Sequence, residues 1–344
     1  MKVGSLHFDR PEHLVATCPA SERGLSRDSI RLMVSTSEGH QHTQFHNLAD
    51  QFRTGDVLVV NNSATMPASL PAEGRIGEFR LNLATDYGRG LWLAEPRWSV
   101  SQPGPLALKH GDVISIGELQ AKLIAPYPNL PRLWFVQFDG CVVCSMDKIG
   151  EPIRYGYVKS AYDLQHYQTV FSRVRGSVEM PSAAYPFTES VVESLKHKGV
   201  QIAEITLHTG VSSLEVEVDD IEAHTLYPEP FSVSDETAQI INQAKEDNQR
   251  IVAVGTTVVR ALESSWNGTV VQAKSGFTRR YIHPKVGIHV IDGLITGLHD
   301  PVTSHLAMLY TVASEDRIRE AYREAIAEGY LWHEFGDSHL IWRG

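Results

Sequence analysis

The segment IVAVGTTVVRALESSW brings several reactive side chains to the end of an expected strand. Its apolar run leads to Gly255, Thr256 and Thr257. A helical pattern that carries Arg260 and Glu263 follows without a loop. Backbone N–H groups at a helix start favour anions, and an arginine can hold a carboxylate through two hydrogen bonds. The segment therefore indicates an anion site, although a capped helix with a surface ion pair explains the pattern equally well.

Polar side chains also flank other expected strands. His208 lies at the end of ITLHTG, and Asp337 lies in the polar turn of HEFGDSHLI. In VIDGLITGLHDP, Asp292 precedes the strand and His299 follows it. Ligands of α/β sheets bind beyond the carboxyl ends of strands, and a histidine there can act as a general acid or base. His208 and His299 are therefore candidate catalytic residues, while a core histidine satisfied by its neighbours is the alternative for His208.

The segment PSAAYPFT precedes an expected helix and supplies candidate binding residues. Its small side chains would let a flat ligand approach the backbone closely. Pro181, Ser182 and Phe187 are therefore candidates for substrate binding. An ordinary entry turn of the helix explains the segment equally well.

Neither the cysteines nor a histidine-rich segment indicates a metal centre. Cys141 and Cys144 have the spacing of half a zinc site, but no second pair exists and their apolar run is typical of a strand. The total of 3 cysteines is odd, which argues against a disulfide framework. We interpret GHQHTQFH, with His40, His42 and His46, as a polar turn rather than as metal ligands. We therefore predict no metal.

Size and composition indicate a soluble enzyme. The chain has 344 residues, 42% of them hydrophobic and 21% charged, which is typical of roughly two globular domains. Its formal net charge of −10 argues against a surface that grips nucleic acid by charge alone. Apolar runs such as DVLVV are far shorter than the ~20 residues of a membrane span, and the N-terminus lacks the apolar core of a signal peptide. We expect a cytoplasmic protein, with no membrane partner, that is a monomer or a small homo-oligomer.

The order of the expected elements predicts an α/β fold with an inserted antiparallel β-barrel. Residues 67–149 contain short alternating runs between Gly, Pro and Asn turns, which are typical of a small barrel. Residues 1–66 and 150–344 alternate strands with helices, which favours a discontinuous catalytic domain with a mixed, mostly parallel sheet. Two of the expected helices follow Thr188 and Ser234, which we predict as N-caps.

Together these motifs resemble the S-adenosylmethionine:tRNA ribosyltransferase-isomerase family of queuosine biosynthesis. VGTTVVRALES and DGLITGLH are the specific matches. FRTGDVLVVNNSATMPASL, TLHTG and FGDSHLI accompany them in the order that the family shows. The resemblance spans nearly the whole chain and implies an α/β domain joined to an inserted β-barrel, which agrees with the pattern of expected elements.

The resemblance implies a reaction between S-adenosylmethionine and tRNA. Enzymes of the family transfer the ribosyl unit of this co-substrate to 7-aminomethyl-7-deazaguanine in a tRNA anticodon, and the ribose rearranges while adenine and methionine leave. That chemistry needs a base for the carbon beside the sulfonium and an acid for the leaving adenine. His208 and His299 suit these steps by residue type, and Asp292 or Glu263 suits an orienting or assisting role. The helix start with Arg260 suits the methionine carboxylate.

The chain departs from the family pattern near its acceptor-side motifs. Where the family typically has Gly, Leu and His, this chain has Ala184, Tyr185 and Pro186, and a second motif is changed at Ser212, Ser213 and Leu214. Arginines and a lysine of the pattern, which would favour a phosphate backbone, are also replaced. Two alternatives therefore stay open: a paralogue that cleaves S-adenosylmethionine or transfers its ribosyl part without tRNA, and a ligand-binding protein without turnover.

Overall fold

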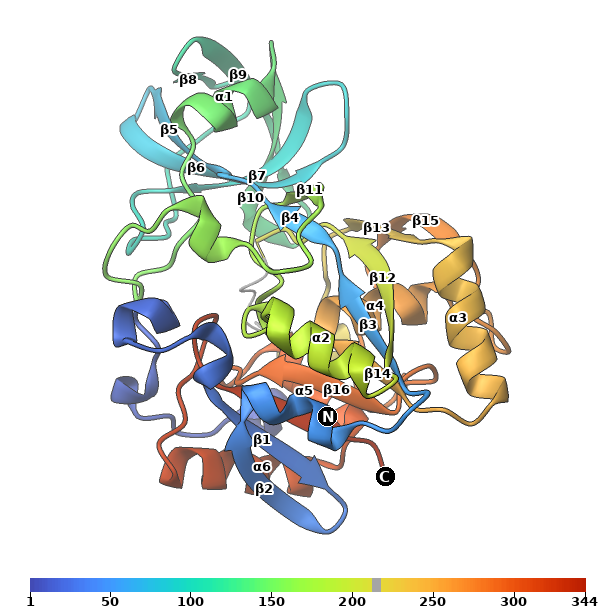
Figure 1. Ribbon diagram of the computed structural model, residues 1–344. Helices are drawn as coiled ribbons and strands as arrows, with labels where there is room; N and C mark the ends of the chain where they lie inside the picture. Colours follow the sequence, from blue (N-terminus) through green and yellow to red (C-terminus); the bar gives the residue numbers. More distant parts are fainter. Residues whose placement is uncertain (212–217) are drawn as a thin grey trace.

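The chain folds into a mixed sheet with helices and, above it, a closed β-barrel (Figure 1). The structure is a computed structural model that describes residues 1–211 and 218–344. The predicted fold class is therefore confirmed. The barrel strands fall between residues 69 and 138, inside the range predicted for the insertion, and the domain boundaries themselves stay a prediction.

The mixed sheet has parallel strands at its centre and antiparallel pairs toward its flanks. Parallel pairing joins β12 to β3, β3 to β14 and β14 to β16, and also β17 to β1. Its strands, in spatial order, are β15 (Lys274–Thr278), β13 (Glu229–Val233), β12 (Gln201–Leu207), β3 (Val57–Asn61), β14 (Ile251–Val254), β16 (Gly293–Gly297), β17 (Ser338–Trp342), β1 (Arg31–Thr36) and β2 (Gly39–Gln44). The central parallel strands bring their carboxyl ends to one edge of the sheet, where ligands of such sheets bind.

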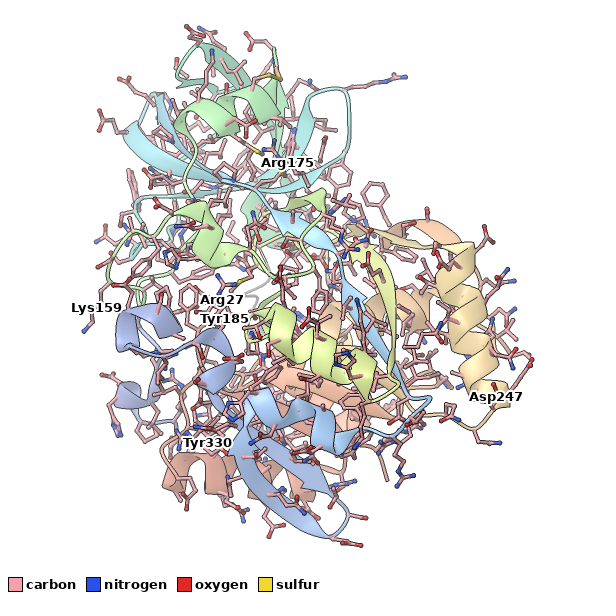
Figure 2. All side chains as sticks on the ribbon, viewed as in Figure 1. Arg27, Lys159, Arg175, Tyr185, Asp247 and Tyr330 are labelled. Atoms are coloured by element: carbon pink, nitrogen blue, oxygen red, sulfur yellow. A yellow bond between two sulfur atoms is a disulfide. The ribbon has the colours of Figure 1, made fainter. Side chains whose placement is uncertain are left out.

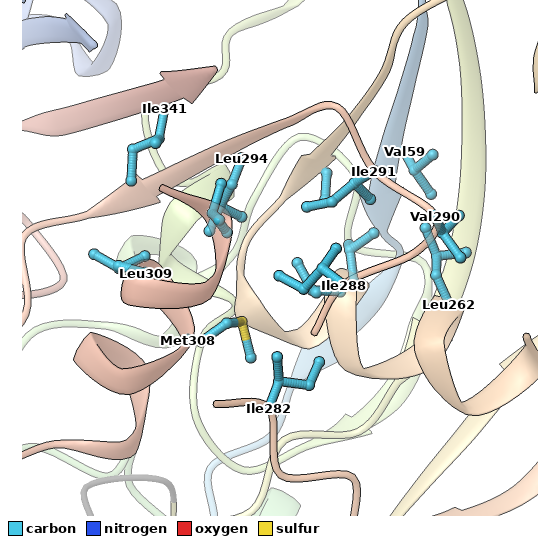
Figure 3. Packing of buried hydrophobic residues seen from close by; sticks show 14 of the residues in the cluster. Val59, Leu262, Ile282, Ile288, Val290, Ile291, Leu294, Met308, Leu309 and Ile341 are labelled. Carbon is cyan, nitrogen blue, oxygen red and sulfur yellow. The ribbon is translucent and has the colours of Figure 1, made fainter. Parts of the chain in front are cut away.

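Alternating side chains of these strands build a core on each face of the sheet. Leu58 and Val252 pack on the face covered by α2 (Glu189–His197). Val59 and Ala253 pack on the opposite face. Figure 3 shows how Leu262, Met308 and Leu309 meet the sheet residues on this second face. The helices of the second face are α3 (Asp235–Glu246), α4 (Thr256–Ser265), α5 (Ser304–Val312) and α6 (Glu315–Ala327). No helix among the described residues has the length and apolar character to cross a bilayer.

Two helix starts have the caps that the sequence predicts. The Thr188 hydroxyl accepts a hydrogen bond from the Val191 N–H in α2, and the Ser234 hydroxyl accepts one from the Thr237 N–H in α3. Each cap satisfies a backbone N–H that the helix itself leaves unpaired. Short 3-10 helices are η1 (Val3–Leu6), η2 (Glu12–Leu14), η3 (Ala20–Arg23), η4 (Arg27–Ser29), η5 (Phe45–Gln51), η6 (Leu164–Tyr167), η7 (Ser182–Ala184) and η8 (Ile221–Ala223).

The barrel is closed by antiparallel pairs and has its own apolar core. Its strands are, in spatial order, β10 (Leu130–Phe138), β7 (Leu91–Arg97), β6 (Gly77–Asp86), β5 (Ser69–Gly74), β8 (Val113–Ile116) and β9 (Leu119–Tyr127). The helix α1 (Val142–Ile149) follows β10 in the chain. The short parallel pair of β4 (Ser63–Thr65) with β11 (Val174–Ser177) lies below the barrel (Figure 1).

The cysteine and histidine segments differ from their predicted structures. Cys141 and Cys144 form a disulfide at the start of α1 and do not lie in a strand. Cys141 is the N-cap of this helix, and its sulfur accepts a hydrogen bond from the Cys144 N–H. GHQHTQFH forms mainly the edge strand β2 rather than a turn. His40 there bonds to Ser35, at 2.7 Å, and His42 bonds to a tyrosine and a glutamate. Among the described residues no His, Cys, Asp or Glu cluster is arranged to hold a metal ion.

Glu263 and Asp292, two predicted catalytic carboxylates, bind backbone N–H groups away from the carboxyl edge; Glu263 is buried and Asp292 is exposed. The Glu263 carboxylate accepts hydrogen bonds from the N–H groups of His289, at 2.7 Å, and Val290, at 3.0 Å. Asp292 accepts one from the N–H of Ile251, at 2.9 Å. Both Asp292 and Ile251 lie where β16 and β14 begin, so Asp292 is at the opposite end of the sheet from the carboxyl edge.

We predict that Glu263→Ala destabilises the protein by about 3 kcal/mol, because it leaves the buried N–H of Val290 and the partly buried N–H of His289 without an acceptor. Urea denaturation measures the change in the free energy of unfolding. Glu315→Gln is the matched control, since Glu315 forms a partly exposed pair with Arg319, and such pairs contribute about 0.5 kcal/mol or less. Equal stability of the two variants would contradict a structural role for Glu263.

Candidate active site

A cavity of about 400 Å³ lies at the carboxyl edge of the central strands. It is lined by the residues that follow β14 and β16, together with segments that connect the sheet to the barrel. These segments are 153–157, 178–183, 255–257, 296–301 and 333–334. The volume falls in the range of small-molecule sites, roughly 300–1,000 Å³.

One end of the cavity is formed by the start of α4. Gly255 joins β14 to this helix with a φ of 91°, and Thr256 and Thr257 line the cavity. No side chain caps the helix at Gly255. The first N–H groups of α4 therefore have no intrahelical partner, and the positive end of the helix dipole faces the cavity.

Arg260 adds a cation to the same end. Its Nη1 forms an ion pair with the buried carboxylate of Glu229, and its Nε donates to the Arg280 carbonyl at 3.1 Å. Its Nη2 is buried and has no hydrogen-bond partner among the residues that the structure describes. Because a buried guanidinium N–H without a partner is costly, the free Nη2 indicates an acceptor that a bound ligand would supply.

The other end of the cavity is aromatic and anionic. The rings of Tyr155 and Tyr157 stack with centroids 6.1 Å apart, and Tyr157 stacks on His333 at 4.1 Å. The Tyr157 hydroxyl donates to Glu334 at 2.6 Å, and the Tyr155 hydroxyl donates to Glu179. Aromatic faces and carboxylates both attract a cation. This end therefore suits a positively charged or flat aromatic group.

Glu334 is poised to exchange a proton near neutral pH. Burial raises the pKa of its carboxyl to about 7, the charge of Glu179 adds to this rise, and the hydrogen bond from Tyr157 opposes it. A carboxyl group with a pKa close to the working pH is an effective general acid or base. Glu334 therefore has the properties that the sequence analysis assigned to histidines.

Neutral imidazoles line the cavity between its two ends. His299 and His305 stack with centroids 4.7 Å apart. Burial lowers the pKa of His299 well below its usual range, and burial together with the Arg260 charge lowers the pKa of His305 to about 4. The Thr296 hydroxyl bonds to Nε2 of His299 at 2.7 Å. Both rings are uncharged at neutral pH, so they can accept protons or hydrogen bonds.

The structure brings most of the predicted site residues together. Those that line the cavity are Pro181, Ser182, Gly255, Thr256, Thr257, Arg260 and His299. Those that do not line it are Phe187, His208, Glu263, Asp292 and Asp337.

Three of the outlying residues support the fold beside the cavity. His208 bonds to the Ser63 hydroxyl at 2.7 Å and packs over the backbone of Gly176. Phe187 is 1% exposed and its ring packs against Phe45 at 4.9 Å. Asp337 accepts a hydrogen bond from the Leu331 N–H at 2.8 Å, which holds the turn that presents His333 and Glu334.

The departures from the family pattern at Ala184, Tyr185 and Pro186 are buried and do not line the cavity. The Tyr185 hydroxyl accepts a hydrogen bond from the Ala20 N–H at 3.0 Å, and the Arg27 guanidinium lies 4.5 Å from the centre of its ring. Figure 2 shows Arg27 next to Tyr185. These side chains therefore fill the core beneath the cavity. The departures at Ser212, Ser213 and Leu214 lie outside the described residues.

Sequence reasoning missed the aromatic and anionic end. Glu179 lies just before the segment PSAAYPFT, and His333 and Glu334 open the segment HEFGDSHLI, so both were close to motifs already singled out. His333 has a φ of 74°, which is rare for a non-glycine residue and common at functional turns. Tyr155 and Tyr157 lie in an irregular segment that carries no periodic signal.

Comparisons with known proteins point to one family. A family model described as queuosine biosynthesis protein matches residues 3–341. The S-adenosylmethionine:tRNA ribosyltransferase-isomerase of Thermus thermophilus is 36% identical over 337 residues, which cover 96% of this chain and 97% of the relative. That of Desulfitobacterium hafniense is 35% identical over 352 residues, which cover 99% of this chain and 100% of the relative.

A solved structure is similar along the whole chain. The S-adenosylmethionine tRNA ribosyltransferase from Thermotoga maritima matches with a TM-score of 0.55 and 28% identity, over 98% of this chain and 99% of that chain. The family model and the relatives both extend over nearly the full length, barrel included. The chain therefore belongs to the queuosine biosynthesis protein family.

Proposed function

We propose that this protein transfers the ribosyl unit of S-adenosylmethionine to 7-aminomethyl-7-deazaguanine in tRNA and isomerises it, with release of adenine and methionine. The observation that carries the proposal is a cavity with opposite chemical ends in a chain that the family model matches over residues 3–341. S-adenosylmethionine has a carboxylate at one end and a sulfonium cation near its middle, so a site for it needs both kinds of partner.

The start of α4 suits the carboxylate of the donor. Thr256 and Thr257, with their free N–H groups, and Arg260, with its unpaired Nη2, line the same cavity. Together they offer the hydrogen bonds and the positive charge that a carboxylate prefers. Glu229 already occupies another edge of the Arg260 guanidinium and fixes its orientation.

The aromatic end suits the cationic groups of the reaction. The sulfonium of the donor and the aminomethyl group of the acceptor are both positively charged. Tyr155 and Tyr157 offer ring faces, and Glu179 and Glu334 offer carboxylates. Cation–π contacts and charge pairing in a site of low dielectric favour such groups.

Glu334 suits the proton-abstraction step. A base must remove a proton from the carbon beside the sulfonium, and the electrons of that C–H bond then stay on the acidified carbon. The ionised carboxylate of Glu334 takes this proton in the proposed mechanism. The neutral ring of His299 stays in the cavity as a hydrogen-bond partner for the donor's polar groups.

The buried departures give no reason to expect a changed reaction. Ala184, Tyr185 and Pro186 do not line the cavity, so their side chains do not reshape its wall directly. Two alternatives are a paralogue that cleaves the donor without tRNA and a binding protein without turnover. The first would release adenine without tRNA and the second would release none, so one assay of adenine separates both from the proposed function.

We predict that adenine forms from S-adenosylmethionine only when tRNA carrying 7-aminomethyl-7-deazaguanine is present. Mass spectrometry of the incubated mixture measures adenine and the mass gain of the tRNA. Adenine without tRNA would contradict the proposal and identify a paralogue that acts on the donor alone. Donor binding without any adenine would identify a binding protein.

We predict that Arg260→Lys weakens S-adenosylmethionine binding by about 2 kcal/mol, roughly 30-fold in Kd, because a charged hydrogen bond is lost. Lysine keeps a charge for Glu229, which limits damage to the fold. Titration calorimetry measures the affinity, with Arg319→Lys as a control outside the cavity lining. Unchanged affinity of Arg260→Lys would remove the arginine from the carboxylate site.

We predict that kcat/KM rises as the pH increases through about 7, because Glu334 must lose its proton to act as a base. Glu334→Gln should lower kcat by about 100-fold or more and abolish this rise. Tyr157→Phe removes a hydrogen bond that favours the ionised carboxylate, so the rise should move to higher pH. A pH profile of Glu334→Gln that matches the native profile would show that another group titrates.

A further inference from the structure

The segment 98–104 of the barrel lies beside the cavity. It follows β7 and continues from Arg97, whose guanidinium is 5.7 Å from the centre of the Tyr155 ring. A Cβ placed on Gly156 would lie 3.4 Å from Ser101, which puts the two segments in van der Waals contact. Gly156 stands between two tyrosines that line the cavity. The segment therefore adjoins the cavity wall through Ser101, and we call it the rim.

Trp98 is an exposed aromatic side chain on this rim. Its exposed fraction is 41%, and its ring stacks on no other ring among the described residues. Phe277, another exposed aromatic residue, is different because its ring already stacks on Tyr87 with centroids 5.6 Å apart. Trp98 also lines an open groove with Ser101 and the residues up to Gly104. An indole exposed in a groove can accept a flat partner on its face.

We propose that Trp98 stacks an unpaired base of the RNA substrate, next to the nucleotide whose base enters the cavity. The inference rests on the proposed function, because it takes tRNA as the acceptor. A base that reaches an enclosed site must leave its stack, and its neighbours in a loop are then unstacked as well. Proteins recognise such single-stranded segments by stacking their bases on aromatic side chains.

The charge of the protein favours stacking over attraction to phosphates. With a net charge of −10, the chain as a whole repels RNA, so charge alone does not supply affinity. Arg97 on the rim is paired with Glu95 at 3.2 Å, a carboxylate that it shares with Arg132 at 2.9 Å. Lys159, which points outward in Figure 2, is an exposed cation that follows shortly after Tyr157. Stacking on Trp98 needs no charge and is available to any base.

The test compares the full-length protein with Trp98→Ala, Trp98→Phe and Phe277→Ala. Filter binding at one fixed salt concentration measures the Kd for tRNA that carries 7-aminomethyl-7-deazaguanine. We expect Trp98→Ala to raise this Kd on the order of tenfold, which is typical of one lost base stack. Trp98→Phe should recover most of the affinity because it keeps a ring, and Phe277→Ala should bind like the native protein. The Kd for S-adenosylmethionine should be the same in all four proteins.

The results separate this inference from the proposed function. If the native protein modifies tRNA while Trp98→Ala binds tRNA normally, the inference is overturned and the function stands. Equal losses in Trp98→Ala and Phe277→Ala, or a loss of S-adenosylmethionine affinity in Trp98→Ala, would also overturn it, because either result shows a general effect on the fold. A native protein that neither binds nor modifies tRNA would overturn the proposed function and this inference together.

Discussion

The arrangement of the cavity depends on the turn at Gly255. This residue ends the central strand β14 and starts α4 with a φ of 91°, a conformation that L side chains rarely adopt. A Cβ at this position would also lie 3.2 Å from the Cβ of Ala183, which packs directly against the turn. Because no loop intervenes, the helix points its free N–H groups directly into the space above the sheet. A longer connection would move that positive end, together with Arg260 on the same helix, away from the carboxyl edge of β14.

The second requirement is a set of buried carboxylates with different tasks. Glu229 orients Arg260, Glu263 holds the backbone behind α4, and Glu334 faces the cavity beside Tyr157. A carboxylate held by an ion pair or by several hydrogen bonds acts as a fixed acceptor. A carboxyl whose pKa burial raises toward neutral can instead exchange its proton in catalysis. The same residue type therefore serves structure at two positions and, in the proposed mechanism, chemistry at a third.

Sequence reasoning located the end of the cavity at the start of α4 better than the aromatic and anionic end. The strand end and helix start at Gly255 have a strong periodic signal, so Thr256, Thr257 and Arg260 could be placed together. Asp292 was assigned to the site because it adjoins a strand, but it precedes that strand and so lies at the wrong edge.

Other residues depend on contacts that a sequence does not display. His208 follows its strand as expected, yet its ring bonds to Ser63 while the next residue, Thr209, lines the cavity. Successive side chains of an extended segment point to opposite sides, and which side faces a ligand depends on the packing of β4 and β11. Tyr155 and Glu334 come from irregular segments far apart in the chain, and the fold alone brings them together.

The most direct measurement of the central claim is a crystal structure of the protein with bound S-adenosylmethionine. The account predicts the donor carboxylate within hydrogen-bonding distance of the Thr256 and Thr257 N–H groups and of Nη2 of Arg260, with the sulfonium toward Glu334. A carboxylate bound at the tyrosine end, or a donor bound outside this cavity, would contradict it.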